Sequence, residues 1–260
     1  MTPDEIAKTL NTMCDLAARE TLPRFRTRLA VENKDEIGGF DPVTEADQAA
    51  ENVLRDYVMQ SFPLHGFVGE EAPPFQADAE YCWIVDPVDG TRAFISGLPS
   101  WGTLIGLSRN GEPVAGVMHQ PFTGERYMAT GDSAFLAHAG NREPLSTSAV
   151  TKLEQAILLT TSPFLFAPGK IEKFQTVEKR CKLARYGFDC YGYAMVAAGH
   201  ADLVVECGLK TFDIAALIPV VQQAGGKVTN WQGESAIDGG CVLAAANPDL
   251  HAQALEILAS

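Results

Sequence analysis

The sequence lacks a long run of apolar residues. No stretch of its 260 residues approaches the roughly 18 unbroken apolar residues that a membrane span requires. The amino-terminal segment also lacks the basic start and apolar middle of a secretory signal, and its apolar spacing is typical of an amphipathic helix. Hydrophobic residues make up 46% of the chain and charged residues 20%, close to the globular average. We therefore expect a soluble, cytoplasmic globular protein without a membrane partner.

Cysteine pairs with metal-ligand spacing are absent as well. The six cysteines form no C-x-x-C pair and no spacing typical of a zinc site; they are Cys14, Cys82, Cys181, Cys190, Cys207 and Cys241. The sequence therefore predicts reduced, mostly buried thiols.

Positive charge is scarce. The chain has 20 Lys and Arg residues against 33 Asp and Glu, a formal net charge of -13. Such a surface repels phosphate backbones, which argues against nucleic acid or anionic lipid as a partner. A small phosphorylated ligand would need local neutralisation, which bound divalent cations can supply.

The chain is long enough to bury a core as one large domain or as two packed halves. No internal repeat or linker separates them, but the pattern changes near 145 to 150, which divides the chain into residues 1–147 and 148–260. The first part has predicted helices at 3–30 and 44–60 and strands at 83–86, 101–108 and 113–119. Asn110-Gly111 between the last two strands predicts a hairpin, because both residues tolerate positive φ.

The second part alternates strands with helices. Strands are predicted at 156–161, 202–206, 226–230 and 241–246, and helices at 168–180, 190–199, 211–224 and 248–259. We expect Pro219 only to bend the helix that contains it. Helices and sheets in both parts predict a layered sandwich.

Acidic residues cluster in two motifs of the first part that precede the predicted strand at 83–86. In DPVTEADQAAE, Asp47 lies on the helical face that points inward, although it can also complete a capping box with Thr44. In GFVGEEAP, Glu70 and Glu71 follow a short apolar run, and alone this pair indicates only a solvated loop.

The most informative motif is YCWIVDPVDGT. A strand that ends in Asp86-Pro87-Val88-Asp89-Gly90-Thr91 presents two carboxylates about one turn apart, and the N–H groups of Gly90 and Thr91 can hold a phosphate at a helix start. The alternative is a simple Asp-Gly turn. A fourth motif, KTFDIAALIPVVQQAGG, places Asp213 in the first turn of a helix, where an acid is also stabilised by the helix dipole.

These four motifs, in this order, resemble the inositol monophosphatase superfamily, and the resemblance spans roughly Asp41 to Gly226. It implies an α+β fold, a five-layered αβαβα sandwich, and hydrolysis of phosphate monoesters. It also implies two or three Mg²⁺ ions in each site, inhibition by Li⁺ and a homodimer.

The resemblance assigns metal ligands residue by residue. Glu70, Asp86 and the carbonyl of Val88 would hold the first Mg²⁺, and Asp86, Asp89 and Asp213 the second. Asp47 and Glu70 would hold a third, weaker ion. Oxygen-only ligation suits Mg²⁺.

The resemblance also assigns catalytic and phosphate-binding roles. Glu70 and Thr91 would position and deprotonate the attacking water, with Asp47 beside them, and no phosphoenzyme would form. Gly90 and Thr91 would hold the phosphate.

Substrate choice in the superfamily depends on the residue after D-G-T and on the second part of the chain. Arg92 resembles the basic residue of histidinol-phosphate and 3'-phosphoadenosine phosphatases, although an outward-facing arginine is equally compatible. The run RYGFDCY resembles the histidinol-phosphate phosphatases, except that Phe188 stands where they commonly have glycine. The predicted substrate-binding residues are Asp89, Arg92, Arg185, Asp189, Glu206 and Asp213.

Asp189 and Glu206 are the two carboxylates expected to face the leaving group, because histidinol carries a cationic amine. Inositol enzymes also carry a glutamate at the position of Glu206, so Glu206 distinguishes the two substrates less well than Asp189 does. Asp189 can instead cap the helix that follows it. Arg185 would orient Asp189 or the imidazole, or form a surface ion pair.

The predicted reaction is hydrolysis of L-histidinol phosphate to L-histidinol and phosphate, a step of histidine biosynthesis. The main alternative is inositol-1-phosphate phosphatase, since inositol is a neutral polyol that needs only hydrogen bonds. A 3'-phosphoadenosine phosphatase and a non-catalytic regulatory protein are further alternatives.

Overall fold

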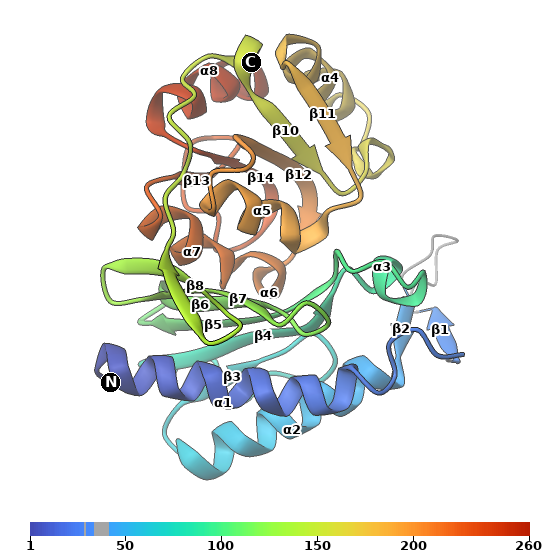
Figure 1. The fold of residues 1–260 in the computed structure, drawn as a ribbon, viewed down its shortest axis with the longest axis vertical. Helices are drawn as coiled ribbons and strands as arrows, with labels where there is room; N and C mark the ends of the chain where they lie inside the picture. Colours follow the sequence, from blue (N-terminus) through green and yellow to red (C-terminus); the bar gives the residue numbers. More distant parts are fainter. Residues whose placement is uncertain (29, 34–41) are drawn as a thin grey trace.

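Five layers of helices and sheets make up the computed structural model, which describes residues 1–28, 30–33 and 42–260 (Figure 1). Asp41, where the resemblance begins, lies outside the described residues. Two helices form the bottom layer in this view, a seven-stranded sheet lies on them, and three short helices separate it from a five-stranded sheet covered by two more helices. The predicted αβαβα sandwich is thereby confirmed. No helix of the described ranges is long and apolar enough to cross a membrane.

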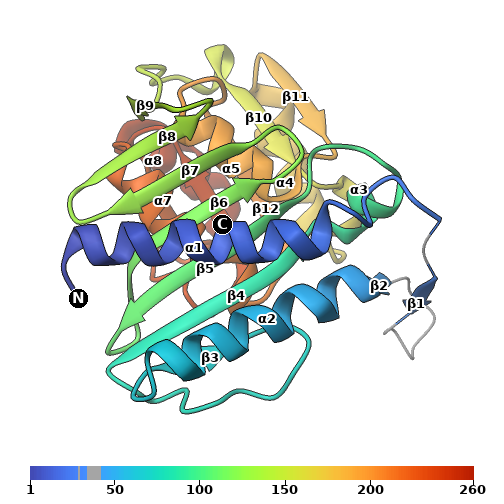
Figure 2. The same cartoon turned by 60° about the horizontal axis from the view of Figure 1, so that its bottom comes forward.

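The bottom layer is formed by α1 (Pro3–Thr21) and α2 (Glu45–Ser61), which lie across one face of the first sheet (Figure 2). Buried side chains of both helices, such as Leu10 and Leu54, pack on Trp83 and Ile105 of the sheet. The first helix ends earlier than the predicted residue 30, because Pro23 cannot continue the helical hydrogen bonding. A small antiparallel pair, β1 (Val31–Asn33) and β2 (Pro42–Thr44), precedes α2.

The first sheet has the strand order β3-β4-β5-β6-β7-β8-β9, and only β3 and β4 are parallel. Its strands are β3 (Gly66–Val68), β4 (Tyr81–Asp89), β5 (Gly102–Arg109), β6 (Glu112–Gln120), β7 (Glu125–Thr130), β8 (Ser133–His138) and β9 (Asn141–Pro144). The predicted hairpin is confirmed, since Asn110 (φ 52°) and Gly111 (φ 83°) join β5 to β6. The short helix α3 (Thr91–Ile95) follows β4.

The second sheet has the order β11-β10-β12-β14-β13, with the first three strands parallel. Its strands are β10 (Ile157–Thr160), β11 (Leu183–Tyr186), β12 (Leu203–Leu209), β13 (Lys227–Asn230) and β14 (Gly240–Ala245). Its outer face packs on α4 (Lys170–Arg180) and α8 (Pro248–Ala259), and α5 (Asp189–Ala197) lies on its inner face. Two single 3-10 turns, η1 (Leu153–Gln155) and η2 (Pro163–Leu165), flank β10.

The helix predicted over 211–224 is interrupted, not merely bent. It forms α6 (Thr211–Ile214) and α7 (Leu217–Gln223), separated by Ala215 and Ala216. The break lies where a proline acts, because the ring of Pro219 collides with the carbonyl four residues earlier, that of Ala215.

Two cysteines are disulfide-bonded, so the prediction of six reduced thiols is wrong for this pair. Cys207 of β12 and Cys241 of β14 are register partners on antiparallel strands, with Cα atoms 3.9 Å apart. The sequence did not indicate the bond because 34 residues separate the two cysteines. Cys14, Cys82, Cys181 and Cys190 are free thiols.

Close packing between the first sheet and α7 depends on Gly116 of β6. A Cβ atom there would lie 2.3 Å from the carbonyl oxygen of Ala216 and 2.8 Å from its Cα atom. We therefore expect Gly116→Ala to lower the free energy of unfolding by about 3 kcal/mol, because backbone atoms must shift to admit the methyl group.

Thermal unfolding measures this effect, with a matched glycine as control. Gly192 in α5 is also buried, but a Cβ atom there would meet its neighbours at 3.5 Å or more, which is ordinary contact. Gly192→Ala should keep or raise the melting temperature. Equal melting temperatures for the two variants would contradict the close-packing argument.

Candidate active site

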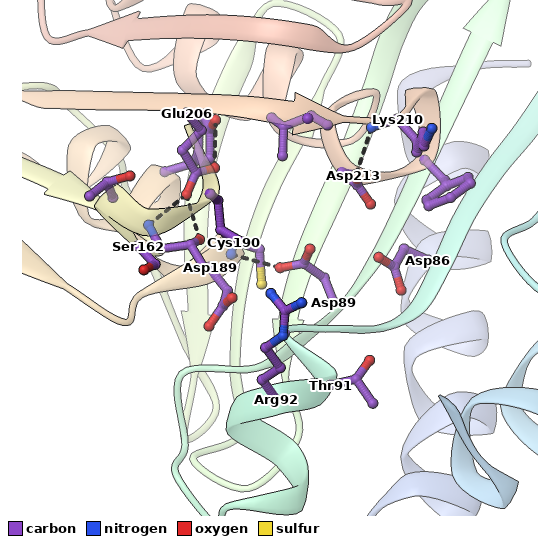
Figure 3. Close-up of a pocket in the computed structure, with 18 of the residues that line it drawn as sticks. Asp86, Asp89, Thr91, Arg92, Ser162, Asp189, Cys190, Glu206, Lys210 and Asp213 are labelled. Carbon is purple, nitrogen blue, oxygen red and sulfur yellow. Dashed lines mark hydrogen bonds between the residues drawn. The ribbon is translucent and has the colours of Figure 1, made fainter. Parts of the chain in front are cut away.

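A cavity of about 370 Å³ lies where the two sheets meet, and both parts of the chain line it (Figure 3). The end of β4 and the start of α3 supply one wall. The ends of β10 and β12 and the starts of α5 and α6 supply the other. The predicted site residues that line it are Glu70, Asp86, Val88, Asp89, Gly90, Thr91, Arg92, Asp189, Glu206 and Asp213.

Three carboxylates meet inside the cavity. One oxygen each from Asp86, Asp89 and Asp213 lie within 4.8 Å of one another. Residues three apart on a regular strand point to opposite faces, but the register of β4 against β5 shifts between Asp86 and Asp89. This bulge turns both side chains to the same side, where they face Asp213 of α6 (Figure 3).

The carboxylates raise one another's pKa. Burial is the first cause for Asp86, which is 2% exposed, and the charges of Glu70, Asp89 and Asp213 raise its pKa further. Burial likewise raises the pKa of Asp213 to about 7, although the Lys210 N–H, which donates to Asp213 Oδ2 at 2.6 Å, opposes the shift. A buried cluster of oxygen ligands with excess negative charge fits a hard divalent cation.

Asp47 plays the helix-capping role and also reaches the site. Its Oδ2 atom accepts hydrogen bonds from the Thr44 amide at 2.9 Å and the Thr44 hydroxyl at 2.6 Å, which completes the capping box of α2. Its Oδ1 atom accepts from the Thr91 hydroxyl at 3.3 Å. The two interpretations of this residue are therefore compatible.

The turn after Asp89 requires glycine. Gly90 has φ 82° and precedes α3, and a Cβ atom there would lie 3.0 Å from Cβ and Cγ of Asp189. This close approach brings the D-G-T turn against the second part of the chain. The Thr91 hydroxyl also donates to the Val88 carbonyl at 3.0 Å, which fixes its orientation.

Asp189 does not cap α5. It is the first residue of the helix, with φ 44°, and the preceding Phe188 makes no side-chain cap. Instead, Asp89 Oδ2 accepts the Cys190 N–H at 2.7 Å, so a carboxylate of the first part caps a helix of the second. The Asp189 side chain lies in the cavity near Arg92 (Figure 3). Burial raises its pKa to about 6, and Thr161 and the Arg92 charge oppose this shift.

Glu206 is 5% exposed and is held by neighbours that the sequence did not indicate. Its Oε1 atom accepts from the Thr161 amide at 2.8 Å and the Thr161 hydroxyl at 2.5 Å, and its Oε2 atom from the Tyr193 hydroxyl at 3.1 Å. Burial raises the pKa of Glu206 to about 7. Thr161 directly follows β10, which pairs in parallel with β12. The pairing of these two strands is the signal that could have identified Thr161 as a partner of Glu206.

Arg185 is the predicted site residue that the structure places elsewhere. It is exposed on β11 and is not among the residues that line the cavity. In the described part of the chain, β11 is an edge strand of the five-stranded sheet.

The layered fold and the carboxylate cavity define a metal-dependent phosphatase. The chain belongs to the inositol monophosphatase family, whose model matches residues 2–260. Among curated relatives, the chloroplastic bifunctional phosphatase IMPL2 of Arabidopsis thaliana is 38% identical, over 98% of this chain and 75% of its own. A histidinol-phosphatase of Chlorobaculum parvum is 35% identical, over 95% of this chain and 93% of its own. A solved inositol monophosphatase of Zymomonas mobilis superposes with a TM-score of 0.87 at 37% identity, covering 99% of each chain.

Proposed function

We propose that the protein is a Mg²⁺-dependent phosphatase that hydrolyses L-histidinol phosphate to L-histidinol and phosphate, a step of histidine biosynthesis. The observation that carries the substrate assignment is Asp189, which lines the same cavity as the metal-binding cluster and adds a second carboxylate to Glu206. The ammonium group of histidinol needs acidic partners, whereas a neutral polyol does not. The Chlorobaculum parvum relative supports this substrate by its name.

The ligand set suits a hard divalent cation such as Mg²⁺ and disfavours softer metals such as Zn²⁺, because only oxygen atoms are offered. Glu70, Asp86 and the Val88 carbonyl would hold one ion and Asp89 and Asp213, with Asp86, a second. Asp47 and Glu70 would hold a third. Bound ions supply positive charge to the phosphate oxygens and lower the pKa of water.

The side chains of the D-G-T turn prepare the attack on phosphorus. The Thr91 hydroxyl donates toward the Val88 carbonyl and Asp47 Oδ1, so its lone pairs are free to accept a hydrogen bond from the attacking water. Glu70 lines the same cavity and would accept a second hydrogen bond from this water and then its proton. The amides of Gly90 and Thr91 hold the phosphate, and the attack is in line with the leaving group.

The second candidate is inositol-1-phosphate hydrolysis. It is favoured by the Zymomonas mobilis structure, which covers 99% of this chain at 37% identity and is named as an inositol monophosphatase. In that case Glu206 would accept hydrogen bonds from ring hydroxyls.

The resemblance to the family further supports a homodimer, Li⁺ inhibition and a cytoplasmic location, and we propose all three. We also propose that residues 1–147 carry the metal and phosphate motifs and that residues 148–260 carry the specificity residues with one metal ligand, Asp213.

Phosphate release tests the substrate assignment. The assay compares kcat/KM with Mg²⁺ for histidinol phosphate, inositol-1-phosphate and 3'-phosphoadenosine-5'-phosphate. We expect a preference of about tenfold or more for histidinol phosphate, and no release in excess chelator. A higher kcat/KM for inositol-1-phosphate would overturn the substrate but not the phosphatase class.

A further inference from the structure

Thr161 is bonded to Glu206 and to the turn that leads to Asp189, the two carboxylates proposed to face the leaving group. Thr161 directly follows β10, whose neighbours on both sides, β11 and β12, run parallel to it. Glu206 lies on β12, and Asp189 begins the helix that follows β11. The parallel order of these three strands therefore places Thr161 next to both acids.

Thr161 makes two hydrogen bonds to one oxygen of Glu206. Its amide and its hydroxyl both donate to Oε1, at 2.8 and 2.5 Å, while the Tyr193 hydroxyl donates to Oε2 at 3.1 Å. A carboxylate with partners on both oxygens has a fixed orientation. These contacts therefore determine the direction in which Glu206 can accept a further hydrogen bond.

Thr161 also holds the chain segment that leads to Asp189. Its carbonyl accepts the Gly187 N–H at 2.9 Å, two residues before Asp189. The Thr161 side chain also lowers the pKa of the Asp189 carboxyl, against the effect of burial. One residue thus bonds to Glu206 and to the turn between β11 and α5 that leads to Asp189.

We propose that Thr161 is a positioning residue for substrate specificity, which holds Glu206 and Asp189 in the orientation that receives the leaving group. The inference rests on the proposed function for the identity of that group. The hydroxyl takes no part in the chemistry at phosphorus, since Asp86, Asp89 and the D-G-T turn are on the opposite wall of the cavity.

The test is a comparison of KM and kcat for Thr161→Val. Loss of a hydroxyl that bonds a buried carboxylate is expected to raise KM for histidinol phosphate about tenfold or more. We expect kcat to change less than about threefold and the Mg²⁺ concentration for half activation to stay unchanged, because Thr161 holds neither phosphate nor metal. Thr161→Ser restores the hydroxyl and should restore KM.

Thr160→Val is the matched control. The neighbouring hydroxyl of Thr160 is buried, with 2% of the residue exposed, and has no hydrogen-bond partner in the described part of the chain. The same chemical change there removes no hydrogen bond, so KM should stay within about twofold of the wild type. Thermal unfolding of each variant shows that a kinetic change does not result from loss of the fold.

Each outcome separates this inference from the substrate assignment. An unchanged KM in Thr161→Val, or an equal loss in Thr160→Val, would overturn the positioning role. A wild type that prefers inositol-1-phosphate would overturn the substrate assignment. If KM for that ester is still raised in Thr161→Val and restored in Thr161→Ser, the positioning role is supported.

Discussion

Asp86→Asn is expected to reduce phosphate release at least about 10³-fold, a loss near 4 kcal/mol of transition-state stabilisation. Asp86 is the most enclosed member of the carboxylate cluster, at 2% exposed, and would bind both main metal ions. Asparagine retains the shape and removes the charge. The same change should raise the melting temperature of the metal-free protein, because burial first, and then the charges of Glu70, Asp89 and Asp213, raise the pKa of Asp86 and disfavour its ionised form.

Two measurements on one variant distinguish a ligand from a structural acid. Thermal unfolding with chelator and with Mg²⁺ should show a large metal-dependent increase for the wild type and a small one for Asp86→Asn. Asp132→Asn, in the exposed turn between β7 and β8, is the control and should behave as the wild type in both. An Asp86→Asn protein that retains a tenth of the activity, or the full stabilisation by Mg²⁺, would show that Asp86 is not a metal ligand.

Asp189→Asn is expected to invert or erase the preference for histidinol phosphate. The variant keeps the contact with Gly90 but lacks the charge that a cationic leaving group needs, so kcat/KM for histidinol phosphate should fall about 30-fold or more. Hydrolysis of inositol-1-phosphate should fall much less, because a neutral ring loses one hydrogen bond and no ion pair.

The two esters are measured with the same enzyme preparation, so a folding defect lowers both rates together. Arg185→Met serves as the control because Arg185 is exposed on β11, outside the residues that line the cavity, and we expect both rates within twofold of the wild type. A parallel loss with both esters in Asp189→Asn would assign Asp189 to the structure of the cavity instead of to substrate choice.

The parts of the site that could be predicted from the sequence are those encoded by neighbouring residues. Asp86, Asp89 and Gly90 lie in one turn, and their spacing alone indicated two carboxylates beside a helix start. Thr161 escaped prediction because its partners lie 28 and 45 residues away, and only the order of the strands brings them together. The position of Arg185 at a sheet edge was hidden for the same reason.

The fold shows the same division between local and distant information. The hairpin at Asn110-Gly111 and the boundary of α2 at Thr44 follow from the conformational preferences of single residues. The bond between Cys207 and Cys241 depends on the pairing of β12 with β14, which no local pattern specifies. The break before Pro219 could have been inferred, since proline opposes the carbonyl of Ala215 regardless of tertiary context.

The hydrogen bond from Cys190 to Asp89 joins the carboxylate cluster to the segment that carries Asp189. Asp89 accepts from the first turn of α5, and Asp189 begins that turn. If Asp89 holds a metal ion, as proposed, an ion that moves this carboxylate also moves the start of α5. Binding of the metal and binding of the leaving group would then be coupled, and because such coupling is reciprocal, each would change the affinity for the other by the same factor.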